Sequence, residues 1–295
     1  MSGHRGRTAQ ESAEHAAERL SGVLGALDLA AAGTDAFTAA PFTEVGMDRS
    51  FGGQLLAQAL VAAARTVTPR VPAHSLHAYF LRAGDPREET VFQVSRLRDG
   101  RRTHSRSVAV SQGGRTLATM TASFADPVHG LEHQHTAPPS PAPETLPTLA
   151  AWAEPHGGLS EYWFTMRTVE TRVVADAPDG RSTAWHRMAG RLPDDPLLHQ
   201  ALLVYLSDVT TLAAALVPHG MPLGVEQVDG VAWDGVSLDH AVWFHRPARA
   251  DDWLMFAQQS PSASGGRGLI RADVFSGSGA LVASVAQEGM FFTAP

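Results

Sequence analysis

The sequence predicts an α+β protein made of two copies of one unit, each an antiparallel sheet wrapped around a buried central helix. The chain of 295 residues divides at a proline-rich segment into halves of similar length, and these halves resemble each other in order. Each half also contains one helix-length run that is apolar on nearly all sides, followed by segments with the two-residue alternation of strands. Two such units can pair edge to edge, which predicts one continuous sheet.

The chain is expected to divide into four segments. Residues 1–20 are polar and predicted to be a flexible N-terminus, and residues 21–126 form the first repeat. Residues 127–158 are predicted to be a linker, because five prolines within 138–147 disfavour regular structure. Residues 159–295 form the second repeat.

The two central helices have recognisable sequence signals. The first is GGQLLAQALVAAARTV, with Ser50 as its expected N-cap. The second is LLHQALLVYLSDVTTLAAAL, which follows the turn LPDDP and ends before His219 and Gly220. Because both runs are apolar around their circumference, we expect both helices to be buried.

The strands that follow each helix carry the repeat. A shift of 164 residues aligns HSLHAYFLRAGDP with the segment around LDHAVWFHRP and places Arg82 on Arg246. A shift of 165 aligns the later strands and places Arg106 on Arg271. Recurrence in both halves favours structural roles for these arginines.

Composition excludes several classes of function. The formal net charge is −7 and only 18% of residues are charged, which argues against a nucleic-acid or anionic-membrane surface. The chain contains no cysteine, so disulfides, a thiolate nucleophile and cysteine-ligated metals are excluded. The polar N-terminus lacks the apolar core of a signal peptide, and the longest apolar run, residues 201–217, is too short to span a bilayer. We expect a cytoplasmic protein with no membrane span and no metal.

Gln287 breaks the pattern of the last strand, GALVASVAQEG. It follows Leu281, Ala283 and Val285 on the face that alternation assigns to the core. At the shift of 165 its counterpart in the first half is Ala122, so only the second half is polar there. A buried amide without partners costs roughly 1–3 kcal/mol, so polar groups are expected beside it.

Two further residues complete a candidate site. Asp208 is predicted to lie mid-helix among core residues, and an alignment through Gln54 and Gln200 places it opposite Ala62. Ser237 begins the strand SLDHAVWFH. Each residue alone is consistent with an ordinary structural contact. Together, the carboxylate, the hydroxyl and the amide of Gln287 could hold one water molecule and take its proton.

At these residues the sequence resembles the acyl-CoA thioesterase II family, the double-hotdog thioesterases. The matching stretches run in order from about residue 20 to residue 290: FGGQLLAQAL, HSLHAYFLRAGDP, LRDGRRTHSRSVAV, MTASFADP with GLEHQ, LPDDPLLHQALLVYLSD, LDHAVWFHRP and LVASVAQEG. The resemblance implies a double hotdog fold and an enzyme that hydrolyses the thioester of its fatty acyl-CoA substrate. It also implies no metal or redox cofactor. Its implied catalytic residues are Asp208 in LSDVT, Ser237 before LDH, where many bacterial members carry Thr, and Gln287 in QEG.

The expected mechanism is proton transfer from water to Asp208, with backbone N–H groups near the start of a central helix stabilising the oxyanion. Leu202, Leu206, Val209 and Leu212 are predicted to line an acyl tunnel along the second helix.

Two alternatives stay open: a non-catalytic acyl-CoA binding protein and a hotdog enoyl-CoA hydratase. The hydratase needs an Asp–His pair near a helix start, which no motif supplies; His240 and His245 are interpreted as structural. Exposed surfaces of this fold often pair, so a homodimer or a higher homo-oligomer is expected.

Overall fold

The structure is a computed structural model that describes residues 20–42, 49–68, 71–159, 163, 166, 168–174, 181–221, 223–224 and 233–293. All but the last residue of the predicted flexible segment 1–20 lies outside the described residues. The strands are β1 (Ala30–Gly33), β2 (Ala36–Ala39), β3 (Ala73–Phe80), β4 (Thr90–Asp99), β5 (Thr103–Gln112), β6 (Arg115–Ala125), β7 (Val169–Val174), β8 (Arg181–Met188), β9 (Trp233–Ser237), β10 (Asp239–Phe244), β11 (Leu254–Ser264), β12 (Arg267–Ser276) and β13 (Leu281–Thr293).

These strands form one antiparallel sheet in the order β1-β2-β4-β5-β6-β3-β10-β13-β12-β11-β8-β7, with β9 paired to β13. The centre is the pair β3–β10, in which Leu76 lies opposite Val242. Outward from this pair, the first half continues through β6, β5 and β4, and the second through the matching β13, β12 and β11. The predicted continuous sheet made of two equivalent units is therefore confirmed.

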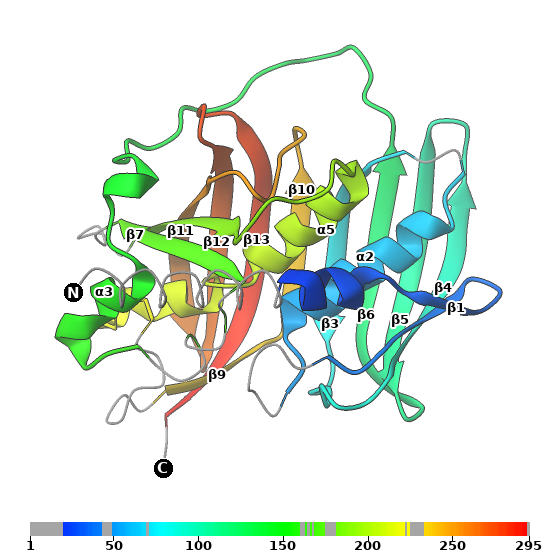
Figure 1. Cartoon of the computed structure of the whole chain (residues 1–295), viewed down its shortest axis with the longest axis horizontal. Helices are drawn as coiled ribbons and strands as arrows, with labels where there is room; N and C mark the ends of the chain where they lie inside the picture. Colours follow the sequence, from blue (N-terminus) through cyan, green and yellow to red (C-terminus); the bar gives the residue numbers. More distant parts are fainter. Residues whose placement is uncertain are drawn as a thin grey trace, which may run out of the picture.

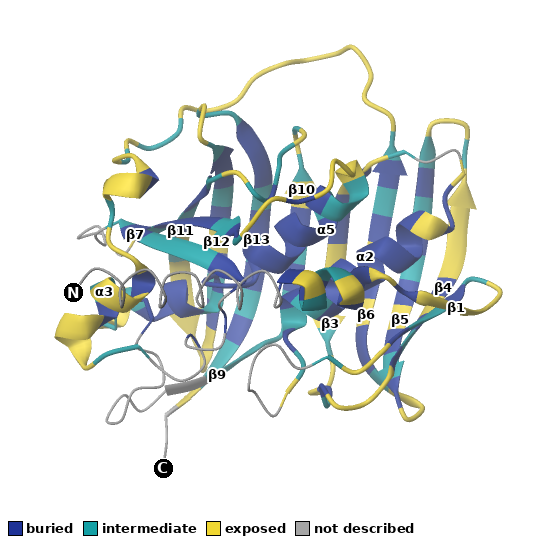
Figure 2. Cartoon of the chain, in the orientation of Figure 1, coloured by how far each residue is buried: buried dark blue, intermediate teal, exposed yellow. Residues whose placement is uncertain are grey.

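Two central helices, α2 (Gly52–Arg65) and α5 (Pro196–Ser207), lie against the same face of this sheet (Figure 1). Both are buried along most of their length (Figure 2), as their all-round apolar sequences predict. Their side chains belong to one hydrophobic cluster that runs through both halves.

The two helices begin differently. Helix α5 begins with Pro196 after Asp195, whose side chain accepts from the N–H groups of Leu197 and Leu198. Helix α2 has Phe51 at its N-cap and no side-chain cap from its own segment, so the predicted Ser50 cap is wrong. A side chain from the other half of the chain caps α2 instead, as described below.

Helix α5 also ends earlier than predicted. Its last residue is Ser207, and Asp208 is the C-cap rather than a mid-helix residue. Hydroxyl groups compete for backbone carbonyls at this point, since Thr211 Oγ1 donates to Ser207 O. Two short 3₁₀ segments follow, η3 (Leu212–Ala215) and η4 (Val217–His219).

The stretch Pro196–His219 is long and apolar enough to cross a membrane by length and composition, which corrects the length argument made from the sequence. In this fold, however, 83% of its most apolar window is buried inside the protein. Burial against the sheet therefore accounts for its hydrophobicity.

The segment 127–158 crosses from the first half to the second without α-helix or strand until α3 (Leu149–Ala153), which is flanked by η1 (Pro143–Thr145) and η2 (Glu154–His156) (Figure 1). It is attached to the second half. The Gln134 side chain donates to Gly279 O and accepts from Leu281 N. The prolines therefore exclude α-helix and strand over their own stretch, where only the 3₁₀ segment η1 forms, without making the segment independent of the fold.

Candidate active site

Asp208 lies where the two halves meet, between the C-terminus of α5 and the N-terminus of α2. Its Oδ2 accepts the backbone N–H of Gly53 at 2.7 Å, so Asp208 provides the capping oxygen that the sequence around α2 lacks. A Cβ added at Gly52 would lie 2.8 Å from the same oxygen and 2.9 Å from Cζ of Phe80. Glycine at position 52 is what allows the helix to approach the carboxylate so closely.

Gln287 connects the other two predicted residues. Its side chain is fully buried, and Nε2 donates to Asp208 Oδ1 at 2.8 Å and to Ser237 Oγ at 2.6 Å. Ser237 ends β9 opposite Gly289 of β13, so these two strands place the hydroxyl beside the amide. Asp208, Ser237 and Gln287 are thus brought together from one helix end and two strands.

Burial gives Asp208 the properties of a base. Desolvation raises its pKa from 3.8 to about 6, and the hydrogen bonds from Gln287 and Gly53 partly oppose that rise. At neutral pH the carboxylate is therefore ionised yet close to its pKa, as general-base catalysis requires. The N-terminal end of the α2 dipole further favours the negative charge.

His240 on β10 is a fourth member of this cluster that sequence reasoning assigned to structure. Its Nδ1 lies 3.9 Å from Asp208 Oδ1, and its Nε2 is 2.8 Å from Ser207 Oγ. Burial lowers its pKa to about 4, with an opposing contribution from Gln287, so the ring is neutral at neutral pH. The available signal was its alternation with Val242, which places both side chains on the inner face.

A cavity of about 440 Å³ lies next to the end of α5; Val209 lines it, whereas Asp208, Ser237, Gln287 and His240 do not. Its apolar lining includes Leu149, Leu159, Trp163, Met166, Val169 and Val209. Of the four predicted tunnel residues only Val209 lines it, immediately after Asp208 in the chain. Leu202 and Leu206 are fully buried in the core, and Leu212 lies against Gly289.

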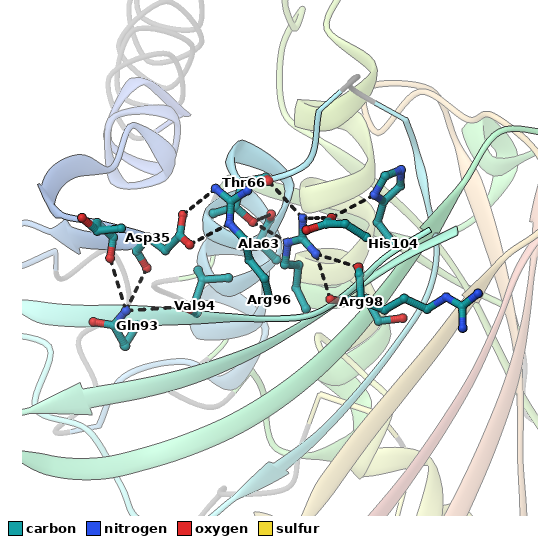
Figure 3. Close-up of polar contacts among 12 residues, drawn as sticks. Asp35, Ala63, Thr66, Gln93, Val94, Arg96, Arg98 and His104 are labelled. Atoms are coloured by element: carbon teal, nitrogen blue, oxygen red, sulfur yellow. Dashed lines mark hydrogen bonds and ion pairs between the residues drawn. The ribbon is translucent and has the colours of Figure 1, made fainter. Parts of the chain in front are cut away.

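The equivalent place in the first half holds a different group. Thr66 is the C-cap of α2, as Asp208 is of α5, so the two residues hold the same position at the helix ends, whereas the sequence alignment placed Asp208 opposite Ala62. Arg106 is fully buried there and donates to Thr66 Oγ1 at 2.7 Å and to Asp99 Oδ1 at 2.5 Å. Figure 3 shows this network. An ion pair between Arg96 and Asp35 lies next to it.

Strand register explains why the arginines differ. Arg106 pairs with Ala122, whereas Gln287 pairs with Ile270 and not with Arg271. Arg106 therefore corresponds to Ile270, and Arg271 is exposed, so the predicted equivalence of Arg106 and Arg271 is wrong by one residue. The hairpin between β12 and β13 is one residue longer, which moves the register.

The other recurring arginine pair keeps one role in both halves. Arg82 donates to Thr116 O and Arg246 to Leu281 O, at equivalent places in the two hairpins.

Among the described residues, no group of three or more histidine and carboxylate side chains is arranged to hold a metal ion. His135, one of the linker histidines, is paired instead with Asp273 at 3.2 Å.

Comparison with known proteins gives matches to acyl-CoA thioesterases. Two family models match: one described as acyl-CoA thioesterase over residues 159–290, and one described as acyl-CoA thioesterase N-terminal domain over residues 38–125. Acyl-CoA thioesterase 2 of Haemophilus influenzae is 35% identical over 262 residues, which cover 84% of this chain and 89% of the relative.

Two solved structures agree with this. An acyl-CoA thioesterase II from Mycobacterium marinum is 38% identical with a TM-score of 0.77, covering 92% of this chain and 98% of its own. A protein from Alicyclobacillus acidocaldarius described as having a hot dog fold has a TM-score of 0.75 at 21% identity, covering 92% and 98% of the two chains, and shares the fold. The predicted double hotdog architecture is therefore confirmed.

Proposed function

The chain belongs to the acyl-CoA thioesterase family, and we propose that it hydrolyses acyl-CoA thioesters to a carboxylate and coenzyme A, with Asp208 as the base that activates water. The observation that supports this proposal most directly is the hydrogen-bonded set of Asp208, Gln287 and Ser237, buried at the junction of the two halves. This set combines a carboxylate of raised pKa with two groups that can position a small polar molecule beside it.

In the proposed reaction, Asp208 removes one proton from water as the water oxygen attacks the thioester carbonyl carbon. The carbonyl oxygen becomes an oxyanion, and its return to a carbonyl breaks the carbon–sulfur bond. Coenzyme A leaves as a thiolate, which takes up the proton held by Asp208 either directly or through solvent, and the carboxylic acid formed releases its remaining proton to solvent. Ser237 keeps the water in line with the carbonyl, and Gln287 holds the Ser237 hydroxyl and fixes the orientation of the carboxylate.

The oxyanion is assigned to the N-terminus of α2. The first N–H groups of an α-helix have no partner within the helix, and the helix dipole adds positive potential there. The N–H of Gly53 is bonded to Asp208, and we assign the neighbouring N–H of Gly52 to the oxyanion. The cavity beside Val209 would receive the acyl chain.

A thiol-release assay with palmitoyl-CoA tests this function. The wild-type protein is expected to release free coenzyme A, and Asp208→Asn is expected to lower kcat by at least about 100-fold, because the base is removed. Asp35→Asn is the matched control: Asp35 lies in the first half and pairs with Arg96, so its loss should leave kcat unchanged. A folded Asp208→Asn protein that works at the wild-type rate would contradict the proposal.

Running the thiol-release assay with palmitoyl-CoA and with an enoyl-CoA separates the alternatives. The structure does contain an Asp–His pair near a helix start, Asp208 and His240, which the sequence did not reveal because the helix belongs to the other half. Enoyl-CoA consumed without thiol release would indicate a hydratase, and binding without turnover would indicate a carrier.

A further inference from the structure

Two buried polar atoms beside Asp208 have no hydrogen-bond partner among the described residues. They are Nδ1 of His240 and Oε1 of Gln287. Both residues are fully buried, and Nδ1 of His240 lies 3.9 Å from Oδ1 of Asp208. Buried polar atoms are almost always satisfied, so this arrangement requires an explanation.

Ser207 determines which ring nitrogen of His240 carries the proton. Its Oγ donates to Val204 O at 2.8 Å, and a hydroxyl has only one proton to donate. With that proton engaged, we assign the contact of 2.8 Å between Ser207 Oγ and His240 Nε2 to a bond from Nε2–H to the serine oxygen. A neutral imidazole protonated at Nε2 carries a lone pair at Nδ1, so Nδ1 is an acceptor.

In this tautomer His240 Nδ1 and Asp208 Oδ1 are two acceptors that face each other, and neither can donate a proton to the other. The two protons of Gln287 Nε2 are directed to Asp208 and Ser237, so the amide cannot supply one. A separation of 3.9 Å is too long for a direct hydrogen bond, yet one water molecule can bond to both atoms at about 2.8 Å. Water has the two donors that this site lacks.

We propose that His240 is a further residue of the hydrolytic site: its Nδ1 accepts a hydrogen bond from the water that Asp208 activates, and Ser207 holds the imidazole in the tautomer that leaves Nδ1 free. This rests on the proposed hydrolysis. One O–H of the water points to Asp208, which takes that proton, and the other to Nδ1, which keeps the oxygen lone pair directed at the carbonyl. Asp208 is the one ionisable side chain that the described contacts place against Nδ1.

Two substitutions separate this role from a structural one. His240→Gln keeps an N–H near the position of Nε2 and can still bond to Ser207, but it has no polar atom at the position of Nδ1. His240→Asn places a carbonyl oxygen near the position of Nδ1 and loses the bond to Ser207. The proposal predicts that His240→Gln lowers kcat by roughly 10- to 100-fold with little change in KM, because one hydrogen bond to the reacting water is lost. His240→Asn should retain more activity.

Ser207→Ala tests the tautomer. Without the serine oxygen, the ring proton is free to move to Nδ1, where it faces the carboxylate, so kcat should fall by a few-fold. Ser182→Ala is the matched control, because Ser182 is equally buried on β8 and its hydroxyl has no partner among the described residues. Unfolding temperatures of all variants report whether they fold.

A measurement on the wild-type protein completes the test. ¹⁵N NMR of the histidine side chains should show His240 neutral with the proton on Nε2 between about pH 5.5 and 9. A proton on Nδ1, or a folded His240→Gln protein more active than His240→Asn, would overturn the proposal. If the wild-type protein released no coenzyme A, the proposed function itself would have failed, which is a different result.

Discussion

Asp208→Asn should change stability and activity in opposite directions. The pKa of Asp208 is raised from 3.8 to about 6 on folding, mainly by burial, which is about two pKa units or about 3 kcal/mol of free energy. The folded state therefore binds this proton more tightly than the unfolded state. The corresponding stability is fully present below pH 3.8 and is lost as the pH rises through about 6.

At neutral pH the wild-type protein thus holds a buried carboxylate at a cost that Asn avoids. The free energy of unfolding of Asp208→Asn, relative to that of the wild type, should therefore increase as the pH rises. The increase should be about 3 kcal/mol from about pH 3.5 to about pH 7. Urea unfolding of both proteins across this range measures it. The acid side of the wild-type kcat/KM profile should fall with an apparent pKa near 6.

The control has the opposite sign. The Arg96 side chain lowers the pKa of Asp35, so that carboxylate adds stability above its unfolded pKa and loses it as the pH falls. Asp35 also has a φ of 53°, a left-handed conformation that Asn tolerates, so Asp35→Asn changes the charge with little backbone strain. If the stability difference for Asp208→Asn did not change with pH, or changed as it does for Asp35→Asn, the argument from burial would be refuted.

Three further predictions concern neighbouring positions. Gly52→Ala should reduce kcat at least about 10-fold, because its Cβ would press on Asp208 Oδ2 and on Phe80. Steady-state kinetics and a melting curve measure this together: a lower unfolding temperature with unchanged kcat would mean that the effect is purely structural. Ser237→Thr should retain most activity and Ser237→Ala should lose it, since Thr keeps the hydroxyl that Gln287 bonds; equal rates for the two variants would rule out a role for that oxygen. Arg106→Met should lower the free energy of unfolding by about 2–4 kcal/mol, because Asp99 and Thr66 lose their partner, while kcat of the folded protein stays unchanged.

Local patterns were sufficient to predict the parts of the fold that depend on burial. The all-round apolar composition of two segments predicts that α2 and α5 are buried, and two-residue alternation predicts the strands around them. Comparison of the two halves showed that Gln287 is polar where the first half has Ala122, which drew attention to the other polar residues of the second half, Asp208 and Ser237.

Tertiary structure decided what lies beyond a single segment. The cap of α2 comes from Asp208, which is 155 positions from Gly53, and no local signal encodes a partner so distant. His240 looked like one more strand residue because its neighbours Ser207 and Asp208 belong to a helix end. The register between β12 and β13 depends on the length of one hairpin, so an ungapped alignment misplaced Arg271.

The amino-acid sequence by itself thus determined the repeated architecture, because solvent exclusion and alternation act along neighbouring positions, and it predicted Asp208, Ser237 and Gln287 as one candidate site. Only the tertiary structure brought the N-terminus of α2, in the first repeat, to the Asp208 carboxylate of the second repeat. Hydrogen bonds form between atoms about 3 Å apart in space, and that proximity exists only once the sheet has closed around both helices.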